Sequence, residues 1–460
     1  MRSMLPVTSG TAMPRRSLLT TVAGVSGGAV LAGCGAASSQ QTSPDPAAHL
    51  KPLTSGPTPT TGSSSTHAPS PTTGTTSSSP STAQSSRSDS PTAGGHPGML
   101  HTTADFARMA AKVAAGAQPW RAGWERLVAN PHSQSGWRPR PAATVYRGSG
   151  TPENYAALYN DIHAAYQNAL RWKVSGDTKH ADTARDVLNA WAHTLTRVDG
   201  TADKFLAAGI YGYQFANAAE ILRGYAGFDL AACQHLLQTV FYPLSSSFLA
   251  RHNGAFITNY WANWDLCSMA CVLAVGILNG DHAKVDEAVT YFKSGAGYGS
   301  IEHAVQFLHP GGLGQWQESG RDQGHTTLGI GLAGTICEMA WNQGVDLYGY
   351  DDSRLLKGCE YVARYNLGQD VPFTPFTWKF GAPGVWSGSK DITAVSPQAR
   401  GDVRPIWEMV YNHYVARRGL AAPYTAAFAA KVRAEGGGGD YGPNSGGYDQ
   451  LGFGTLAFSR

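Results

Sequence analysis

Apolar residues recur at three- and four-residue steps along most of the chain after about residue 100. They do so in segment 154–177, where Gly176 ends the series, and again in segment 184–195, which Gly200 follows. Side chains at this spacing lie along one face of a helix, and that face must be buried against another element. The pattern therefore predicts an all-α domain.

Further segments carry the same helical pattern: 203–224, 229–250, 260–279, 283–294, 320–342, 352–366, 403–418 and 424–434. Successive helices joined by turns that contain Gly or Asp form helical hairpins. No fixed short repeat recurs, which favours an α/α toroid over an open solenoid. The exception is the Pro- and Gly-rich region 368–400, where we expect a short β-hairpin.

Aromatic residues at loop-to-helix junctions support the toroid. The inner helix ends of a toroid surround a cleft in which sugars can stack on flat rings. A place in the core is the alternative for each of these tryptophans, because Trp is also a common core residue. The tryptophans at such positions are Trp261, Trp264, Trp316, Trp378 and Trp386.

The first 34 residues have the pattern of an export signal. The pair Arg15-Arg16 precedes an apolar stretch at 22–31 that is too short to be a good membrane span, as in the twin-arginine route. Leu-Ala-Gly-Cys at 31–34 matches a lipoprotein cleavage box, which would leave Cys34 as the lipidated first residue. A cleaved secretory peptide with an incidental cysteine is the alternative.

Residues 35–96 are almost entirely Ser, Thr, Pro, Gly and Ala. Such a composition buries too little surface to fold, so we expect a disordered linker. Signal, linker and a domain at 97–460 together predict an exported protein, lipid-anchored at the outer face of the cytoplasmic membrane, at the cell surface or in the periplasm. The lipid anchor would be its only membrane contact.

The composition of the whole chain sets weaker limits. Its 460 residues, 42% of them hydrophobic, are ample for a core. The formal net charge of +3 permits an acidic substrate without requiring one, and we expect a monomer with no nucleic-acid partner. Besides Cys34 there are five cysteines, so at least one is unpaired unless chains pair with each other. Cys267 and Cys271, one helical turn apart in an apolar run, are expected in the core.

The segment GGLGQWQESGRDQGHTTLGIGL (311–332) passes from a glycine-rich loop through polar residues into small and apolar ones. Ser319 and Asp322 fit a capping box, which predicts a helix from about residue 320 with Arg321 and His325 on one face. A helix N-terminus favours an anion, and the arginine strengthens that preference. Structural roles stay open: a salt bridge from Arg321 to Glu318, and a capping rather than a catalytic role for Asp322.

Two other helix entrances carry polar and aromatic residues. Within 256–278, Asn259 and Asn263 are four residues apart and would stack on one helix face; Asn259 is a candidate cap, and Asn263 is the better functional candidate. Within 207–222, Tyr213 and Gln214 precede an apolar helix. Core packing is the default interpretation for such a tyrosine.

Other familiar motifs do not indicate a site. Residues 329–334 match GxGxxG, but they follow a polar loop rather than a strand, so they do not indicate a dinucleotide site. His303, His309 and His325 lack metal-ligand spacing. We therefore expect neither a metal nor a cofactor.

Four stretches carry a resemblance to one family: YGYQFANAAEILR, NYWANWDLCSMA, HPGGLGQWQESGRDQGHTTLGIGLAG and DQLGFGTL. They resemble the alginate lyase superfamily of polysaccharide lyases, and the resemblance covers nearly all of 97–460. It implies an α/α toroid, an incomplete barrel of helical hairpins, in an actinobacterial-type surface lipoprotein. The implied activity is cleavage of a uronic-acid polymer, alginate or a related polyuronate, by β-elimination.

β-Elimination removes the C5 proton of a uronate and expels the 4-linked oxygen. The reaction needs donors that neutralise the neighbouring carboxylate, a base and an acid. Relatives have a Tyr-Trp-x-x-Trp pattern, similar to Tyr260, Trp261 and Trp264 here, but place an Asn-His pair just before it, and this chain lacks that histidine. Relatives also place an arginine-rich helix start before a catalytic tyrosine, where this chain has Arg321 and His325.

The resemblance implies a role for each candidate. Arg321 and Asn263 would hold the substrate carboxylate, His325 would move a proton, and a tyrosine, Tyr260 or Tyr213, would be its partner. Trp261, Trp264 and Trp316 would be sugar platforms. The other substrate-binding candidates are polar residues of the same segments: Gln214, Asn259, Gln317, Glu318 and Gln323.

Two other functions remain open from the residues. A glycoside hydrolase on the same toroid would use two carboxylates from among Glu318, Asp322 and Asp265 as acid and base. A non-catalytic glycan-binding protein would keep the aromatic cleft and bind polymer without shortening it.

Overall fold

The computed structural model of the protein describes residues 95–148, 153–439 and 448–460. The chain divides into two units, Met1–Ala37 and Ser38–Arg460, and the described residues all belong to the second. The predicted export signal, Cys34 and nearly all of the predicted linker lie outside the described residues. The fold below is therefore that of the predicted C-terminal domain.

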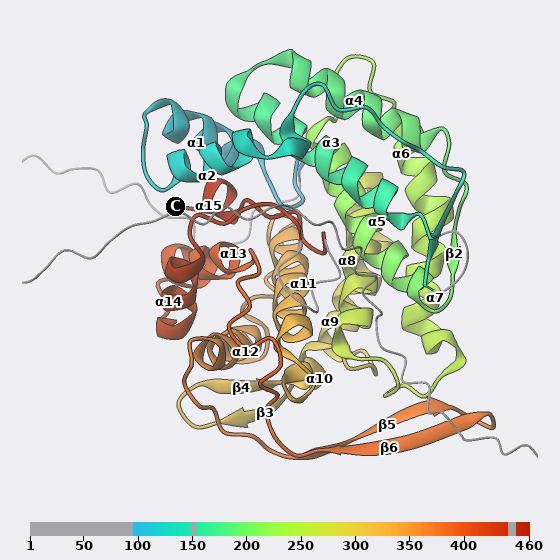
Figure 1. Ribbon diagram of the computed structural model, residues 1–460, viewed down its shortest axis with the longest axis vertical. Coiled ribbons are helices and arrows are strands. Elements are labelled where there is room, and N and C mark those ends of the chain that lie inside the picture. Colours follow the sequence, from blue (N-terminus) through green and yellow to red (C-terminus); the bar gives the residue numbers. More distant parts are fainter. Residues whose placement is uncertain (1–94, 149–152, 440–447) are drawn as a thin grey trace, which may run out of the picture. The chain divides into compact units, whose positions relative to one another are not determined.

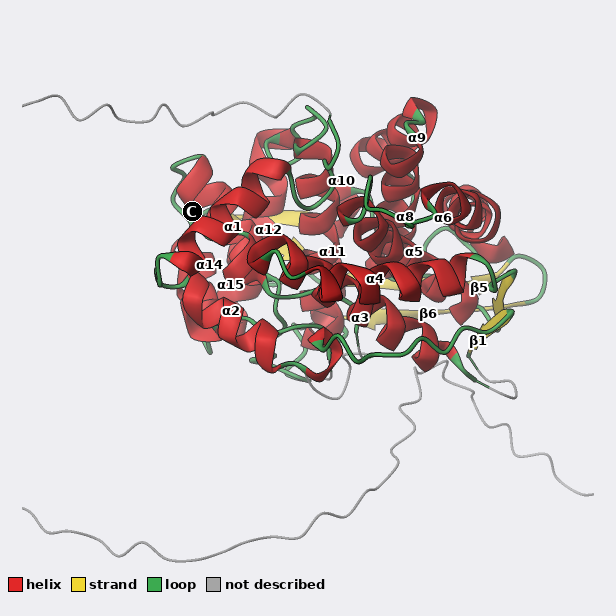
Figure 2. Ribbon diagram, turned by 90° about the horizontal axis from the view of Figure 1, so that it is seen from above, coloured by secondary structure: helices red, strands yellow, loops and turns green. Residues whose placement is uncertain are grey.

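Helices make up most of the described residues (Figures 1 and 2). The α-helices are α1 (Thr103–Ala114), α2 (Trp120–Ala129), α3 (Tyr155–Ser175), α4 (Thr178–Ala192), α5 (Asp203–Ile221), α6 (Leu230–Leu236), α7 (Tyr242–Arg251), α8 (Ala262–Asn279), α9 (His282–Ser294), α10 (Ile301–Ala304), α11 (Gln323–Trp341), α12 (Tyr350–Asn366), α13 (Trp407–Tyr411), α14 (Pro423–Val432) and α15 (Gly454–Ala457). The strands are β1 (Thr144–Arg147), β2 (Arg197–Gly200), β3 (Val305–His309), β4 (Leu313–Trp316), β5 (Phe376–Ala382) and β6 (Trp386–Ile392).

Four long helices form the inner layer. α3, α5, α8 and α11 contact one another in that order, and α5, α8 and α11 are buried along almost their whole length. α4 packs on α3, α9 on α8 and α12 on α11. α8 is long and apolar enough to cross a membrane, but 89% of it is buried inside the domain, as in the core helix of a globular fold. The two layers of helical hairpins have the predicted α/α-toroid arrangement.

Most predicted helices are present, with two interruptions. The predicted helix 229–250 is α6 and α7 joined by a π-helical turn, Leu237–Phe241. The predicted helix 403–418 starts only at Trp407 and continues from α13 into a second π-helical stretch, Asn412–Arg417. The apolar spacing did not predict these turns, because π-helical turns occur mostly as single turns within a longer helix and do not end it.

Three small two-stranded sheets accompany the helices. β5 and β6 form the antiparallel hairpin predicted in the Pro- and Gly-rich region, with Phe376 opposite Ile392 and Ala382 opposite Trp386. β1 pairs with β2 in parallel, and β3 pairs with β4 in antiparallel. These two pairs have strands of only four or five residues, too short for an alternating pattern to be recognised.

Small residues allow the inner helices α5 and α8 to approach closely. A Cβ on Gly209 would lie 2.5 Å from Cys267 Sγ and 2.8 Å from the Cys267 carbonyl carbon, and one on Gly212 would lie 2.5 Å from Cys271 Sγ. Both cysteines are fully buried, which confirms that they are core residues. Within the described part of the chain the cysteines form no disulfide.

Replacing Gly209 with alanine is expected to lower the free energy of unfolding by about 1–3 kcal/mol. The added methyl group would meet backbone of α8, which cannot turn aside as a side chain can. A lower thermal unfolding midpoint would show the effect. Gly136→Ala adds the same methyl group where no atom lies within 4 Å, so an equal change in both variants would contradict the packing argument.

The GxGxxG sequence in α11 is also a packing feature. A Cβ on Gly329 would lie 2.6 Å from the ring of Trp316, one on Gly331 would lie 2.6 Å from Ile406, and one on Gly334 would lie 2.8 Å from Met409. The motif lies inside a helix rather than between a strand and a helix. Its glycines therefore provide a flat surface against which neighbouring side chains pack.

Candidate active site

The helix in the polar segment begins three residues later than predicted. α11 starts at Gln323 with Asp322 as its N-cap, and a short 3-10 turn, Gln317–Gly320, precedes it. Asp322 Oδ1 accepts a hydrogen bond from the backbone N–H of His325 at 2.8 Å. Asp322 is thus confirmed as a cap, but Ser319 is not the N-cap, because the chain becomes extended at Asp322 before the helix begins.

His325 is held through both ring nitrogens. Nδ1 donates to Asp322 Oδ2 at 2.7 Å, and Arg321 Nη2 donates to Nε2 at 3.1 Å. This pair of bonds fits the tautomer with the proton on Nδ1 and the lone pair on Nε2. Burial lowers the pKa of His325, and the positive charge of Arg321 lowers it further. The imidazole is therefore neutral near neutral pH, as a general base must be.

Arg321 joins the histidine to a buried carboxyl group. Its Nη1 donates to Glu318 Oε1 at 3.2 Å, and its guanidinium carbon lies 5.3 Å from the ring centre of Trp261. The predicted proximity of Arg321 and His325 is confirmed, and so is the alternative salt bridge with Glu318. The two coexist because a guanidinium has five N–H donors, which leaves some for an anion.

Glu318 links the starts of α8 and α11. Its Oε1 also accepts from Asn263 Nδ2 at 2.9 Å, and the neighbouring Gln317 Oε1 accepts from the backbone N–H of Ala262 at 3.2 Å. The Glu318 side chain is fully buried, and burial raises its pKa to about 8 although Arg321 acts in the opposite direction. Near neutral pH this carboxyl group is mostly protonated.

Two buried oxygens at this point are unsatisfied. Glu318 Oε2 and Asn263 Oδ1 have no hydrogen-bond partner among the described residues. A buried polar atom without a partner costs free energy, and such atoms gather where a ligand or water completes the bonding. The junction of α8 and α11 is therefore suited to a polar ligand.

The aromatic candidates differ in exposure. Tyr260, Trp261 and Trp264 are half-buried, and the ring centres of Tyr260 and Trp264 are 4.6 Å apart. Burial raises the pKa of Tyr260, so its hydroxyl group stays protonated, as a general acid must be. Trp316 is fully buried against Gly329. A ring with no exposed face cannot stack on a sugar, so the predicted platform at Trp316 is wrong.

Asn259 and Gln323 hold segments of the chain together. Asn259 lies before α8 rather than on its face, because the N-cap of α8 is Trp261, and the predicted stacking with Asn263 is therefore wrong. Asn259 Oδ1 accepts from the backbone N–H of Gly381 at 2.6 Å, which joins it to β5. The buried Gln323 donates from Nε2 to the Ser319 and Ser396 carbonyl oxygens at 3.1 and 3.0 Å.

Tyr213 and Gln214 are buried in the middle of α5. The Tyr213 hydroxyl group donates to the Asp449 carbonyl oxygen at 2.7 Å, and Gln214 Nε2 donates to that of Tyr448 at 2.8 Å. Burial holds the pKa of Tyr213 well above its usual range. These contacts favour the core interpretation of the tyrosine over a role as proton-transfer partner.

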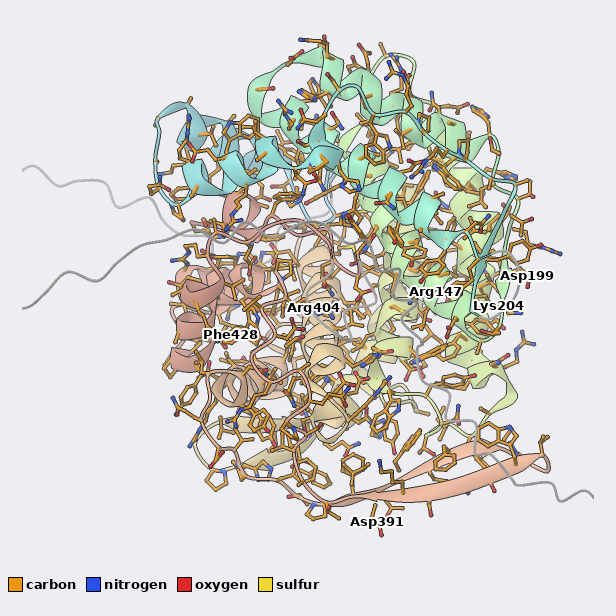
Figure 3. The ribbon with its side chains drawn as sticks, viewed as in Figure 1. Arg147, Asp199, Lys204, Asp391, Arg404 and Phe428 are labelled. Atoms are coloured by element: carbon orange, nitrogen blue, oxygen red, sulfur yellow. The ribbon has the colours of Figure 1, made fainter. Side chains whose placement is uncertain are left out.

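Arg404 is a buried charge that the sequence analysis missed (Figure 3). It donates to Asp449 Oδ2 at 2.9 Å and to the Gly324 carbonyl oxygen, in the first turn of α11, at 3.2 Å. Its charge also contributes to the low pKa of His325. The stretch DQLGFGTL, which begins at Asp449, was the available sequence signal for this ion pair. Arg404 itself lies in an irregular loop and has no periodic pattern that would single it out.

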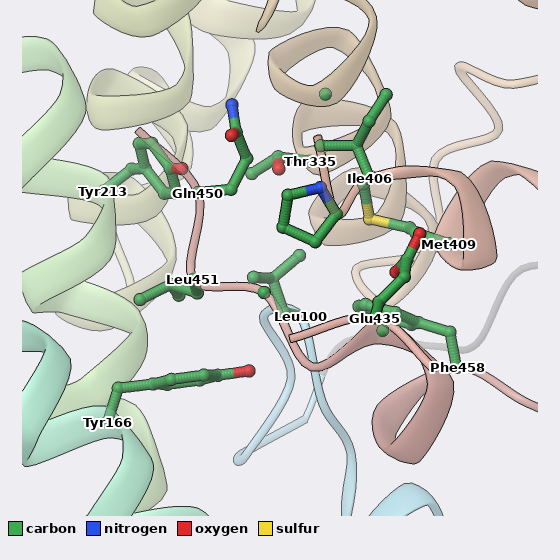
Figure 4. Close-up of a pocket in the computed structure, with 14 residues that line it drawn as sticks. Leu100, Tyr166, Tyr213, Thr335, Ile406, Met409, Glu435, Gln450, Leu451 and Phe458 are labelled. Atoms are coloured by element: carbon green, nitrogen blue, oxygen red, sulfur yellow. The ribbon is translucent and has the colours of Figure 1, made fainter. Parts of the chain in front are cut away.

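A cavity of about 30 Å³ is lined by Tyr166, Tyr213, Glu435 and Gln450 among others (Figure 4). This volume is enough for a water molecule and far too small for a sugar. Neither Arg321 nor His325 lines it. The substrate site is therefore inferred from the side chains at the starts of α8 and α11.

The carboxylates proposed for a hydrolase are used by the fold. Asp265 is fully buried and accepts from His252 Nε2 at 2.7 Å and from the Gly299 backbone N–H at 2.9 Å. Asp322 caps α11 and binds His325. Among the described residues no three His, Cys, Asp or Glu side chains are grouped to hold a metal ion.

Replacing Asp322 with asparagine is expected to lower kcat at least about tenfold. Asparagine caps a helix as well as aspartate does, so the fold should remain, but it cannot fix the His325 tautomer with a negative charge. Asp322 raises the pKa of His325, so without that charge the pKa falls and the acid limb of the kcat–pH profile moves to lower pH. An unchanged profile would contradict a positioning role for Asp322, and an unchanged unfolding midpoint is the control.

At the starts of the inner helices α8 and α11, an arginine, an amide and a neutral histidine lie together, as expected for a polysaccharide lyase. The sequence profile of the family described as alginate lyase matches residues 101–372, more than half of the chain. The chain therefore belongs to the alginate lyase family, and we set aside the hydrolase and glycan-binding interpretations.

Solved structures of alginate lyase A1-III share the fold at low sequence identity. Alginate lyase A1-III from Sphingomonas species A1 is 15% identical with a TM-score of 0.50, over 80% of this chain and 100% of that one. A histidine-to-alanine variant of alginate lyase A1-III in its apo form is 15% identical in sequence with a TM-score of 0.50, and the match covers 78% of this chain and 96% of that one. An alginate lyase from Bacteroides ovatus is 13% identical in sequence with a TM-score of 0.48, and the match covers 79% of this chain and 100% of that one. No curated protein matches the chain significantly.

Proposed function

We propose that this lyase cleaves alginate or a related polyuronate by β-elimination at the junction of α8 and α11. The observation that carries the proposal is the continuous chain of hydrogen bonds from Asn263 through Glu318 and Arg321 to His325 and Asp322. This hydrogen-bond network combines carboxylate-binding donors with a neutral imidazole, and β-elimination from a uronate requires both kinds of group.

The substrate carboxylate would bind to Arg321 and Asn263. Glu318, mostly protonated near neutral pH, would supply a further donor through its unpartnered Oε2. Hydrogen bonds and positive charge at the carboxylate stabilise the negative charge that develops when C5 loses its proton. An Arg321 donor that turns to the substrate also releases Nε2 of His325, which it occupies in the free protein.

His325 Nε2 then takes the C5 proton. The electron pair of the C5–H bond forms the C4=C5 double bond, the C4–O4 bond breaks, and the leaving oxygen takes a proton from the Tyr260 hydroxyl group. The proton on His325 returns to Tyr260 through solvent, which restores the starting state. Trp261 and Trp264 would provide the flat surfaces on which the sugar rings rest.

The polymer is identified by the product. Alginate, glucuronan and pectic polymers would each be incubated with the protein, and the ultraviolet absorbance of the unsaturated uronate followed. We expect a rise with alginate or another polyuronate. Chain shortening with no such rise would indicate hydrolysis, and binding with no shortening would indicate a glycan-binding protein.

Export and lipid anchoring at Cys34 belong to the same proposal. The twin arginines and the Leu-Ala-Gly-Cys box support it, and a surface anchor would hold the enzyme where polysaccharide arrives from outside. Wild type is expected to partition into the detergent phase of a cell extract, and Cys34→Ser into the aqueous phase. Identical partitioning of the two would favour the incidental-cysteine alternative.

A further inference from the structure

The hairpin of β5 and β6 has one aromatic face and one polar face. Directly opposed residues of paired strands share a face. Trp378, Phe380 and Lys390 therefore lie on one face, since Trp378 is opposite Lys390 and Phe380 is opposite Gly388. The other face carries small or polar residues, which are Thr377, Lys379, Gly381, Ser387, Ser389 and Asp391.

The aromatic face continues from the candidate active site. The ring centres of Trp261 and Trp378 are 4.6 Å apart, those of Trp378 and Phe380 are 4.8 Å apart, and those of Phe380 and Trp386 are 6.2 Å apart. The row starts at the ring that lies beneath the Arg321 guanidinium and ends at the turn of the hairpin. We define these four rings as the aromatic row.

The hairpin is fixed to the site at its base. Trp378 Nε1 donates to the Thr258 carbonyl oxygen at 2.9 Å, and the Phe256 backbone N–H donates to the Gly381 carbonyl oxygen at 2.9 Å. A side chain at Gly320, directly before Arg321, would overlap Ile392 at the end of β6. The aromatic row is therefore held in place relative to Arg321 and does not depend on a mobile loop.

The far end of the row is open to solvent. Trp386 is 57% exposed, and Lys390 on the same face is also exposed. An exposed tryptophan on a hairpin that lies at the lower edge of the domain in Figure 1 contributes little to the core. An exposed apolar side chain of this size lowers solubility, and exposed aromatic patches mark binding sites. The hairpin also lies beyond residues 101–372, the part that matches the family profile.

We propose that the aromatic row, with Lys390, is an extended binding surface for the polyuronate chain beyond the sugars at the reaction centre. Flat rings at intervals suit the apolar faces of successive sugars, and the lysine suits their carboxylates. The inference rests on the proposed function, because it takes the occupant to be more of the same polymer. It makes the enzyme favour long chains over short oligosaccharides.

The test compares the affinity for long-chain alginate with that for an alginate trisaccharide. Both are measured in a His325→Ala background, so that the ligand is not cut, using affinity electrophoresis for the polymer and calorimetry for the trisaccharide. Trp386→Ala is expected to weaken polymer binding about three- to tenfold relative to trisaccharide binding. Val385→Ala removes an 80% exposed apolar side chain from the same turn, outside the aromatic row, and is expected to keep the ratio of the parent.

An unchanged ratio in Trp386→Ala, or an equal fall in Val385→Ala, would overturn the inference. Because Trp386 is exposed, its loss should not unfold the protein, and an unchanged unfolding midpoint checks this. If the wild type releases unsaturated product and the ratio is unchanged, this inference alone fails. If the wild type cleaves no polyuronate but Trp386→Ala weakens polymer binding, the proposed function fails and the binding surface stands.

Discussion

The His325→Ala variant is expected to lose at least about a hundredfold in kcat, because proton transfer by a positioned side chain contributes that much or more. His325 is the imidazole that Asp322 orients and that burial and Arg321 keep neutral. Among the described residues, the other groups paired with Arg321 are the carboxyl of Glu318, which is mostly protonated near neutral pH, and that of Asp322, which caps α11. The measurement is the initial rate of unsaturated product formation from the polymer that the wild type cleaves.

The substitution should leave the fold intact. Asp322 caps α11 through the backbone N–H of residue 325, which alanine retains. His303→Ala is the matched control, because His303 bonds to Ser300 and Gly297 and makes none of the contacts of the site. Wild-type activity in His325→Ala would remove this histidine from the mechanism.

Replacing Arg321 with lysine is expected to lower kcat/KM about a hundredfold or more, although the charge is kept. The guanidinium donates to Glu318 and His325 from two different nitrogens. The ammonium group of lysine has a single nitrogen, so it cannot donate to both residues and also bind a substrate carboxylate through two parallel hydrogen bonds. With Arg321→Ala, His325 also loses the charge that lowers its pKa. The pKa therefore rises, and the acid limb of the residual rate–pH profile moves to higher pH.

The direction of this shift separates two roles of the arginine. A residue that only braces the fold would change the unfolding midpoint without moving the pH profile. Arg185→Ala is the control, because Arg185 pairs with Asp182 and Asp186 on α4 and removing it should change neither kcat/KM nor the profile. Unchanged kcat/KM in Arg321→Lys would show that the bidentate geometry is not used.

The sequence predicted the toroid and the meeting of Arg321 with His325, because both depend on local spacing. Apolar periodicity placed the inner helices, and residues four apart near a helix start came together even though the helix begins later than expected. It did not predict that Trp316 is buried while Trp261 is half-buried, since both follow a polar or glycine-rich loop. Burial depends on which helix packs over the ring, and spacing along one chain does not contain that information.

Long-range partners were beyond prediction for the same reason. Arg404 meets Asp449 across 45 residues, and Asn259 meets Gly381 across 122 residues. The position of the hairpin could be predicted from its composition, but the aromatic row depends on the strand register and on the docking of Trp378 against Trp261. A single sequence contains no signal that two distant residues are paired. The type of each residue can still mark it as a candidate for a functional site.

The buried carboxyl group of Glu318 sets the charge that an approaching polyanion meets. Near neutral pH, Glu318 and His325 are mostly uncharged. The charged groups in contact with His325 are then the positive Arg321 and the negative Asp322, whose pKa is lowered by His325 and Arg321 against the opposite effect of burial. The Arg321–Asp322 pair then carries no net charge that would repel a carboxylate-bearing polymer. Above about pH 8, Glu318 becomes negative and the balance turns repulsive. The buried carboxyl group of Glu318 thus makes the binding of an anionic polymer depend on the pH of the medium.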